Sequence, residues 1–208
     1  MFPLFLMKLT LLPPALRDEI AATFGHAEIP AFGQLATVGP DGPEVRTVHF
    51  RFEEPLGTLV FNSHSRSRKM RGLGLDSVAT GCYFDACSGC EWLWCFSTSL
   101  LSSASPTPSA DFKNVDLGLV RDGQWQQTRL DVRIAYWLDH KGLPLGNPLP
   151  TDIDVNVTCP TFVTAICIPY AWQRYRFNEH NYTECTRARY VRHGDAWTKQ
   201  DIPLLYSN

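Results

Sequence analysis

The chain has 208 residues, which is enough to bury a core as a single domain and does not require a second one. Its formal net charge of -2 argues against a nucleic-acid partner, because the basic residues form one local cluster and no extended stripe. Hydrophobic residues make up 44% and aromatic residues 12%, a composition that excludes a wholly disordered chain.

The first seven residues are apolar, but no basic residue precedes them and Lys8 interrupts the run before Pro13 and Pro14. This pattern does not favour a secretory signal. No run of the sequence reaches the ~18 apolar residues of a membrane span. We therefore expect a soluble cytoplasmic protein without a membrane partner, in which residues 16–24 form a short amphipathic helix.

A series of short strands follows this helix. Residues 35–38 and 45–52 flank the turn Gly39-Pro40-Asp41-Gly42, and the second run alternates polar and apolar side chains, which predicts a hairpin. Residues 59–63 form the next predicted strand. The basic helix start Ser65-Arg66-Ser67-Arg68-Lys69-Met70-Arg71 follows at once, and residues 80–84 and 91–95 are two further strands.

Several cationic and hydroxyl side chains are predicted to gather at one end of this small sheet. They are Arg46, Arg51, Ser63, Ser67, Arg68 and Lys69. Guanidinium forks, hydroxyls and helix-start N–H groups can together hold a phosphate group. A basic helix start alone is more often a solvated surface, but the pairing with Arg46 and Ser63 from neighbouring strands favours a phosphorylated small ligand.

Four of the seven cysteines have a spacing that could suggest iron–sulfur or zinc ligands, namely Cys82, Cys87, Cys90 and Cys95. Two of them lie within predicted strands and two flank a turn. Because strand positions far from the turn would not converge with it on one metal, we expect reduced thiols and no metal. A metal-binding module on these cysteines stays as a third hypothesis for the function.

The middle of the chain is less regular. Residues 97–110 are rich in serine and proline, which predicts a loop, with an insertion or a gene-model error that interrupts the preceding strand as the alternatives. Residues 120–138 have the spacing of one amphipathic helix whose apolar face is Ile134, Trp137 and Leu138. A Gly- and Pro-containing connector spans residues 141–152.

The last third predicts strands that complete a barrel. Residues 162–169 form a strand that ends at Pro169, residues 172–177 and 188–192 are two more, and residues 193–196 make the final turn. The fold class expected from the whole chain is mainly β with a few helices, in a single domain over residues 1–208.

Four short pieces carry a resemblance to a known family. They are Ala36-Thr37-Val38, Arg46-Thr47-Val48, Val60-Phe61-Asn62-Ser63 and Ser67-Arg68-Lys69, with Thr186 to Arg192 and Gly194 to Trp197 near the C-terminus. Their order and spacing resemble the pyridoxamine 5'-phosphate oxidase-like split-barrel proteins. The resemblance implies a split β-barrel, FMN as the cofactor, and a homodimer with flavin sites at the subunit interface.

The resemblance also implies the residues that bind FMN. They are Arg46, Thr47, Val48, Asn62, Ser63, Ser67, Arg68, Lys69, Glu91 and Arg187. Arg68 and Lys69 would pair with the phosphate, Glu91 stands where a ring-contacting Gln is common, and Trp172 would supply an aromatic wall.

Two departures from the family pattern concern the substrate. The Arg and His of the family's Arg-x-His-x-Arg run are replaced here by Thr183 and Cys185, and Arg51 stands at the substrate-phosphate Lys position. The resemblance therefore implies FMN binding more strongly than it implies vitamin B6 chemistry. The expected function is a flavin-dependent oxidoreductase with an unidentified small-molecule substrate, and the alternative is a noncatalytic flavin-binding protein. His49 and His64 could be interpreted as catalytic, but His49 alternates with Arg46 and Arg51, which is equally typical of a partly covered sheet face, so no catalytic residue is assigned.

Overall fold

The computed structural model describes residues 12–25, 30–39, 42–73, 78–103, 112, 115–137 and 154–203. Its strands are β1 (Ala31–Gly39), β2 (Gly42–Glu53), β3 (Thr58–His64), β4 (Val78–Asp85), β5 (Cys90–Leu101), β6 (Phe162–Arg176), β7 (Thr186–His193) and β8 (Ala196–Asp201). Its helices are α1 (Pro14–Phe24), α2 (Arg68–Arg71), α3 (Leu117–Gln126), α4 (Leu130–Trp137) and the 3-10 turn η2 (Tyr182–Glu184).

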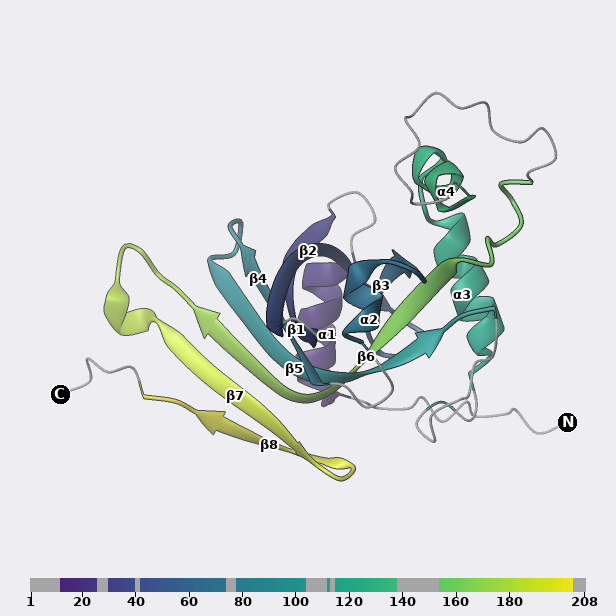
Figure 1. The fold of residues 1–208 in the computed structure, drawn as a ribbon. Helices are drawn as coiled ribbons and strands as arrows, with labels where there is room; N and C mark the ends of the chain where they lie inside the picture. The colour runs from purple at the N-terminus through teal and green to yellow at the C-terminus, as the bar shows by residue number, and fades with distance from the viewer. Residues whose placement is uncertain are drawn as a thin grey trace, which may run out of the picture.

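Six of the strands form a closed antiparallel barrel. The sheet order is β3-β2-β1-β4-β5-β6-β7-β8, and β3 pairs with β6 as well as with β2. This extra pairing closes the ring and leaves β7 and β8 outside it (Figure 1). The predicted mainly β split barrel is therefore confirmed.

Alternating side chains fill the barrel. Trp92, Trp94 and Phe96 of β5 are buried, and Trp94 stacks on Trp172 of β6 at 5.0 Å between ring centroids. The amphipathic helix predicted over residues 16–24 is α1, whose buried side chains Leu16, Ile20 and Phe24 join the same core. Because large aromatic side chains occupy this interior, the barrel is packed and is not a channel.

A glycine makes room for the largest of these side chains. A Cβ atom added at Gly81 of β4 would lie 2.2 Å from the ring of Trp94, its cross-strand neighbour on β5. The indole therefore lies directly over the Gly81 backbone, where no larger residue fits.

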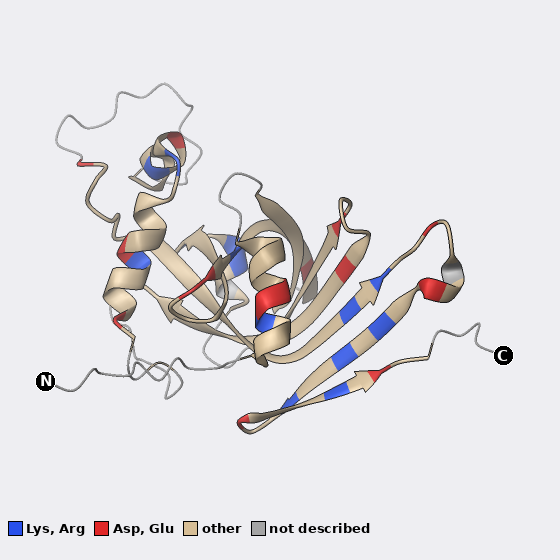
Figure 2. Ribbon diagram, turned by 180° about the vertical axis from the view of Figure 1, so that it is seen from behind, with Lys and Arg blue, Asp and Glu red and all other residues tan. Residues whose placement is uncertain are grey.

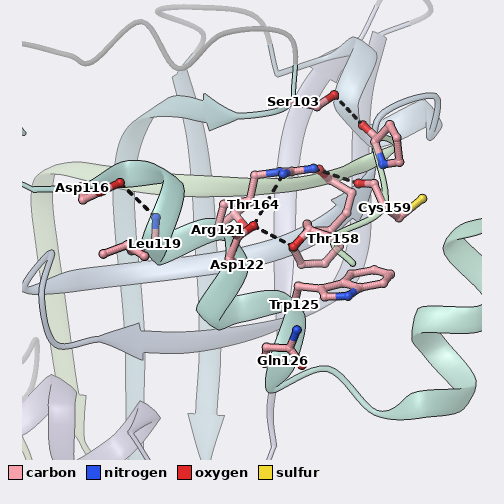
Figure 3. A network of polar contacts seen from close by, with 12 residues as sticks. Ser103, Asp116, Leu119, Arg121, Asp122, Trp125, Gln126, Thr158, Cys159 and Thr164 are labelled. Carbon is pink, nitrogen blue, oxygen red and sulfur yellow. Dashed lines mark hydrogen bonds and ion pairs between the residues drawn. The ribbon is translucent and has the colours of Figure 1, made fainter. Parts of the chain in front are cut away.

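Helix α3 packs on the outside of the barrel. Its Leu117 and Val120 are buried with Val60 and Ile166 in a second apolar cluster. Side chains of α3 also bind the backbone that leads into β6 (Figure 3), since Arg121 donates to the carbonyl oxygens of Cys159 at 2.8 Å and Phe162 at 3.2 Å.

The single helix predicted over residues 120–138 is wrong, because α3 ends at Gln126 and α4 begins at Leu130. Trp125 of α3 and Tyr136 of α4 both contact Phe162, with ring centroids 5.1 and 5.0 Å away. Two short helices can both reach this aromatic cluster, whereas one straight helix could not. Position 138 lies outside the described residues.

The strand predicted to end at Pro169 instead continues to Arg176. Cys95 of β5 pairs with Ala171 and Phe96 pairs with Pro169, so Tyr170 is the extra residue of a β-bulge. A bulge accommodates a proline that cannot donate to the ladder, and it bends the strand. Because of this bend, one long strand pairs with β3 and β5 in the barrel and with β7 outside it.

The loop predicted over residues 97–110 is wrong for its first part. Strand β5 runs unbroken to Leu101, and Ser97, Thr98 and Ser99 pair with β6. Thr98 and Ser99 are buried, which the serine-rich composition did not indicate. Residues 104–110, residues 40 and 41 of the predicted turn, and the connector 141–152 lie outside the described residues.

Strands β7 and β8 extend the sheet beyond the barrel as a two-stranded wing. Figure 1 shows the wing standing away from the barrel at the far end of β6, and Figure 2 shows basic residues along these C-terminal strands. The predicted final turn is the β7–β8 connection, where Gly194 has φ 60. In the part of the chain that the structure describes, none of the helices has the length and apolar character that crossing a membrane requires.

Candidate functional site

Part of the predicted basic cluster forms where β2, β3 and α2 meet, but the inclusion of Arg51 in it is wrong, because Arg51 lies on the opposite face of β2 from Arg46. Ser63 lies near the end of β3 and Ser67 immediately precedes α2, and their Oγ atoms are 2.8 Å apart. Between them the amide of Ser67 donates to the carbonyl of His64 at 2.9 Å, which closes the turn that folds α2 back toward the sheet.

Helix α2 is a single turn of four residues, Arg68–Arg71. So short a helix has too few aligned peptide units for an appreciable dipole, so the contribution of its helix-start N–H groups stays a prediction. The positive potential of this site comes from side chains.

Two of these side chains are cations with donor groups that have no acceptor among the described residues. Burial, and to a smaller degree the neighbouring Arg46 guanidinium, lower the pKa of the Lys69 ammonium. Within the described residues Lys69 has no hydrogen bond or ion pair. The Nε atom of Arg46 is buried and has no hydrogen-bond partner there either. Buried donors are normally paired, so this cluster can accept an anion.

An acidic residue that the sequence analysis missed completes the cluster. Glu44 forms ion pairs with Arg46 and with Arg68, whose Nε lies 2.7 Å from Glu44 Oε1. These guanidinium groups, Arg46 first, lower the pKa of the Glu44 carboxyl. The alternation of β2 could have indicated Glu44, because it stands two residues before Arg46 on the same face.

The side chains of Thr47 and Val48, which follow Arg46 on β2, do not join the basic cluster. Thr47 lies on the opposite face, where its Oγ1 accepts a hydrogen bond from Gln34 at 3.2 Å. The side chain of Val48 is buried in the barrel core. A ligand beside Arg46 can therefore contact the backbone of these two residues more readily than their side chains.

Asn62 faces away from the basic cluster, toward α3. Its amide donates to Gln124 at 3.1 Å and accepts from Thr164 at 2.9 Å, and Gln124 in turn donates to Glu53 at 2.5 Å. This network links β2, β3, β6 and α3. A flavin contact by Asn62 stays a prediction, and it would require the amide to exchange one of these partners.

Arg51, the predicted substrate-side cation, lies on the outer face of β2 beside His49 and Glu53. Burial lowers the pKa of Arg51, and Glu53 partly offsets this. Burial, followed by the charge of Arg51, lowers the pKa of His49 to about 4. The imidazole is therefore neutral near pH 7, and it lies against the exposed ring of Phe32 at 5.2 Å between centroids.

Glu91 and Arg187 lie in another part of the sheet. Glu91 of β5 and Arg187 of β7 both pair with Tyr175, near the C-terminal end of β6. Ser63 pairs with Val163 at the other end of the same strand. Val163 and Tyr175 are twelve residue steps apart along the strand, which is a path of about 40 Å at ~3.3 Å per residue. Within one subunit, Glu91 and Arg187 are therefore not brought together with the basic cluster.

The aromatic wall predicted from Trp172 is wrong. The side chain of Trp172 is 1% exposed and packs between Trp92 and Trp94 inside the barrel. Its position on the inward face of β6 keeps the ring from any ligand on the surface.

Thr183 and Cys185, which replace the Arg and His of the family pattern before Arg187, form hydrogen bonds with neighbouring residues. The Thr183 hydroxyl donates to Asn181 at 2.6 Å, and the Cys185 thiol is buried and accepts a hydrogen bond from the amide of Asn178 at 3.2 Å. These contacts order the turn between β6 and β7. Neither residue contributes a charge to a substrate.

The four cysteines with a metal-like spacing do not all lie on one face of the sheet. Cys90 is buried on the inner face of β5, Cys82 and Cys95 lie on the outer face, and Cys87 is exposed in the turn. All seven cysteines are free, and the described residues contain no group of three candidate metal ligands. The third hypothesis, a metal-binding module, therefore gains no support from this geometry.

No protein-family model and no curated protein matches the chain. Among solved structures, a pyridoxamine 5'-phosphate oxidase-related, FMN-binding protein of Nostoc punctiforme is similar with a TM-score of 0.70 and 24% identity, over 93% of this chain and 98% of that one. PhzG of Burkholderia lata, in complex with tetrahydrophenazine-1-carboxylic acid, has a TM-score of 0.63 and 19% identity, over 97% and 96%. The resemblance is thereby confirmed at the level of fold: the chain has the split β-barrel of the pyridoxamine 5'-phosphate oxidase-like, FMN-binding proteins.

Proposed function

We propose that this protein binds FMN and acts as a flavin-dependent oxidoreductase on a small molecule. Two observations carry the proposal: the half-buried cations Lys69 and Arg46 interact with each other, and the hydroxyls of Ser63 and Ser67 are hydrogen-bonded at the turn that precedes Lys69. The Nostoc punctiforme protein has a similar fold and is an FMN-binding protein, which favours the same cofactor here.

The residues present fit the phosphate group of FMN. Lys69, Arg46 and Arg68 supply three positive charges and Glu44 supplies one negative charge, which leaves a net charge of two. A phosphate monoester carries about -1.5 to -2 at neutral pH, so it would balance this excess. The charged oxygens of the phosphate could also accept hydrogen bonds from the Ser63 and Ser67 hydroxyls and from the buried Nε–H of Arg46.

Bound FMN would supply the redox chemistry, and the chain would supply binding, orientation and exclusion of water. This division explains how the protein can be an enzyme without an evident acid–base pair. His49 is uncharged near pH 7 because its pKa is about 4, so it would act beside a ligand as a neutral hydrogen-bonding group.

We also propose a homodimer that completes the flavin site. If one flavin contacts both the basic cluster and Arg187, the path of about 40 Å along β6 requires that Arg187 come from a second copy. The outer face of β1, β2 and β4 offers apolar side chains for such an interface. They are Phe32, Val38, Val45, Val78 and Phe84, each at least 57% exposed. Exposed apolar groups on one sheet face are typical of a contact surface.

The proposed compartment is the cytoplasm. All seven cysteines are unpaired, which suits a reducing environment.

Titration of the cofactor-free protein with FMN, FAD and riboflavin tests the cofactor. Riboflavin lacks the phosphate, and each charge-assisted hydrogen bond contributes about 1.5–3 kcal/mol, so FMN should bind at least about tenfold more tightly. Equal affinities would contradict a phosphate site.

Turnover tests the reaction. With oxygen or an artificial dye present as electron acceptor to reoxidise the flavin, the FMN-loaded protein should oxidise a hydride donor or an amine substrate over many cycles. Tight FMN binding without turnover across such a panel would leave the noncatalytic flavin-binding protein as the function.

A further inference from the structure

Glu44 occupies the centre of the cationic cluster in the ligand-free protein. Its carboxylate forms ion pairs with Arg46 and Arg68, and its side chain is 14% exposed. A carboxylate and a phosphate prefer the same geometry of guanidinium donors. Glu44 therefore holds the N–H groups that a phosphate would use.

The remaining donors of the cluster are not satisfied by this arrangement. Arg46 Nε is buried without an acceptor, and the ammonium of Lys69 has no ion pair among the described residues. One carboxylate thus compensates two of the three cations and leaves the third without a counter-ion. A tetrahedral dianion has more acceptor oxygens than a carboxylate and could engage all three.

We propose that Glu44 is an internal competitor for the phosphate site, which a phosphate ester displaces from Arg46 and Arg68 when it binds. This inference rests on the proposed function, because it concerns the phosphate of the same cofactor. It assigns to Glu44 a role in setting how tightly, and how selectively, phosphorylated ligands are held.

Two opposing effects follow from a carboxylate in this position. Glu44 keeps the guanidinium groups ordered before the ligand arrives, which reduces the entropy lost on binding. It also repels the incoming phosphate and must give up its own ion pairs. Repulsion decides the balance, since a like charge within a few ångströms costs more in a partly buried site than the ordering of two side chains saves.

The test is the affinity of Glu44→Gln for FMN, riboflavin and inorganic phosphate. Glutamine keeps the size of the side chain and removes its charge, so FMN should bind about tenfold more tightly. Inorganic phosphate should also bind Glu44→Gln more tightly than it binds the unchanged protein, and the affinity for riboflavin should not change. Glu44→Asp, which keeps the charge, should show no gain for FMN.

Glu54→Gln is the matched control. Glu54 is 62% exposed and pairs with Arg17 at 2.6 Å, away from the cluster, and its substitution changes the net charge of the protein by the same amount. An equal gain in Glu54→Gln would show a general effect of net charge and would overturn the proposal.

A measurement on the unchanged chain covers the case in which Glu44→Gln does not fold. Nitrogen-15 NMR of the arginine Nε–H groups should show the Arg68 resonance shifting when FMN is added and staying in place when riboflavin is added. An Arg68 signal that is insensitive to FMN would overturn the proposal.

The failure of this inference is distinguishable from the failure of the proposed function. If the unchanged protein prefers FMN over riboflavin but Glu44→Gln does not improve FMN binding, Glu44 is not a competitor and the FMN site stands. If the unchanged protein binds riboflavin as tightly as FMN, both proposals are wrong.

Discussion

Ser63 and Arg187 are connected through a single strand, since Ser63 pairs with Val163 and Arg187 pairs with Tyr175 at opposite ends of β6. The two residues are therefore rigidly held apart in one subunit. If both contact FMN, each flavin must lie between two copies of the chain, which makes the assembly itself a testable property of the site.

Mixing two defective variants should restore flavin binding. Lys69→Ala and Arg187→Ala should each bind FMN weakly as pure proteins. After they are unfolded and refolded together, random pairing should give about one quarter intact sites, because half of the dimers are mixed and each has one complete site. Flavin absorbance per subunit measures the recovery. No recovery, in a mixture shown to contain mixed dimers, would contradict a site shared between subunits.

Lys69→Ala should weaken FMN binding by about 1.5–3 kcal/mol, the range for a charge-assisted hydrogen bond. Arg68→Ala should have a smaller effect, because Arg68 is 56% exposed and already pairs with Glu44. Isothermal titration gives both values. Lys199→Ala, which removes a lysine paired with Asp201 on β8, is the control. A larger loss in Arg68→Ala than in Lys69→Ala would reverse the proposed order.

Acid should destabilise the protein through His49. The pKa of His49 is about 4 in the fold against 6.5 ordinarily, because of burial and then Arg51. Between these values the unfolded chain binds a proton that the folded chain does not, so stability falls as pH is lowered from 6.5 to 4.

His49→Gln cannot titrate and should make this fall shallower by on the order of 1–2 kcal/mol, allowing for partial exposure. Urea unfolding at a series of pH values measures it. His193→Gln, on the exposed β7–β8 turn, is the control. An unchanged pH dependence in His49→Gln would show that other groups cause the acid sensitivity.

Gly81→Ala should destabilise the barrel by about 3 kcal/mol, because the added Cβ would lie 2.2 Å from the Trp94 ring and the packed core cannot move the indole. Gly123→Ala in α3 meets no atom within 4 Å and should stabilise the protein by about 0.5–1 kcal/mol. Denaturant unfolding compares the two. Equal effects would mean that Trp94 can repack.

The protein should be a poor pyridoxamine 5'-phosphate oxidase. Thr183 and Cys185 carry no charge and order the β6–β7 turn, so a substrate phosphate lacks an arginine contact that contributes about 2–3 kcal/mol. Steady-state oxidation by the FMN-loaded protein should give a kcat/KM below about 10⁴ M⁻¹s⁻¹. A higher value would show that another cation, such as Arg51, replaces the missing one.

The sequence by itself determined the local elements of the site. Alternation in residues 45–52 predicted β2, and the residues around Ser67 and Lys69 predicted a basic corner rich in hydroxyls, because these patterns depend on neighbours in the chain; phosphate binding there stays a prediction. Prediction from the sequence failed where contacts between residues far apart in the chain decide the local structure. Serine-rich residues 97–101 form a strand because β6 pairs with them, and Pro169 lies within a strand because a bulge accommodates it.

Only the tertiary structure decided which predicted residues share a site. Closure of the barrel by β3 and β6 turned Asn62 toward α3 and buried Trp172, while the length of β6 separated Arg187 from Lys69. It also placed Glu44 between Arg46 and Arg68, from different elements. These relationships depend on strand pairing between residues far apart in the chain, and such pairing is set by the packing of the whole core.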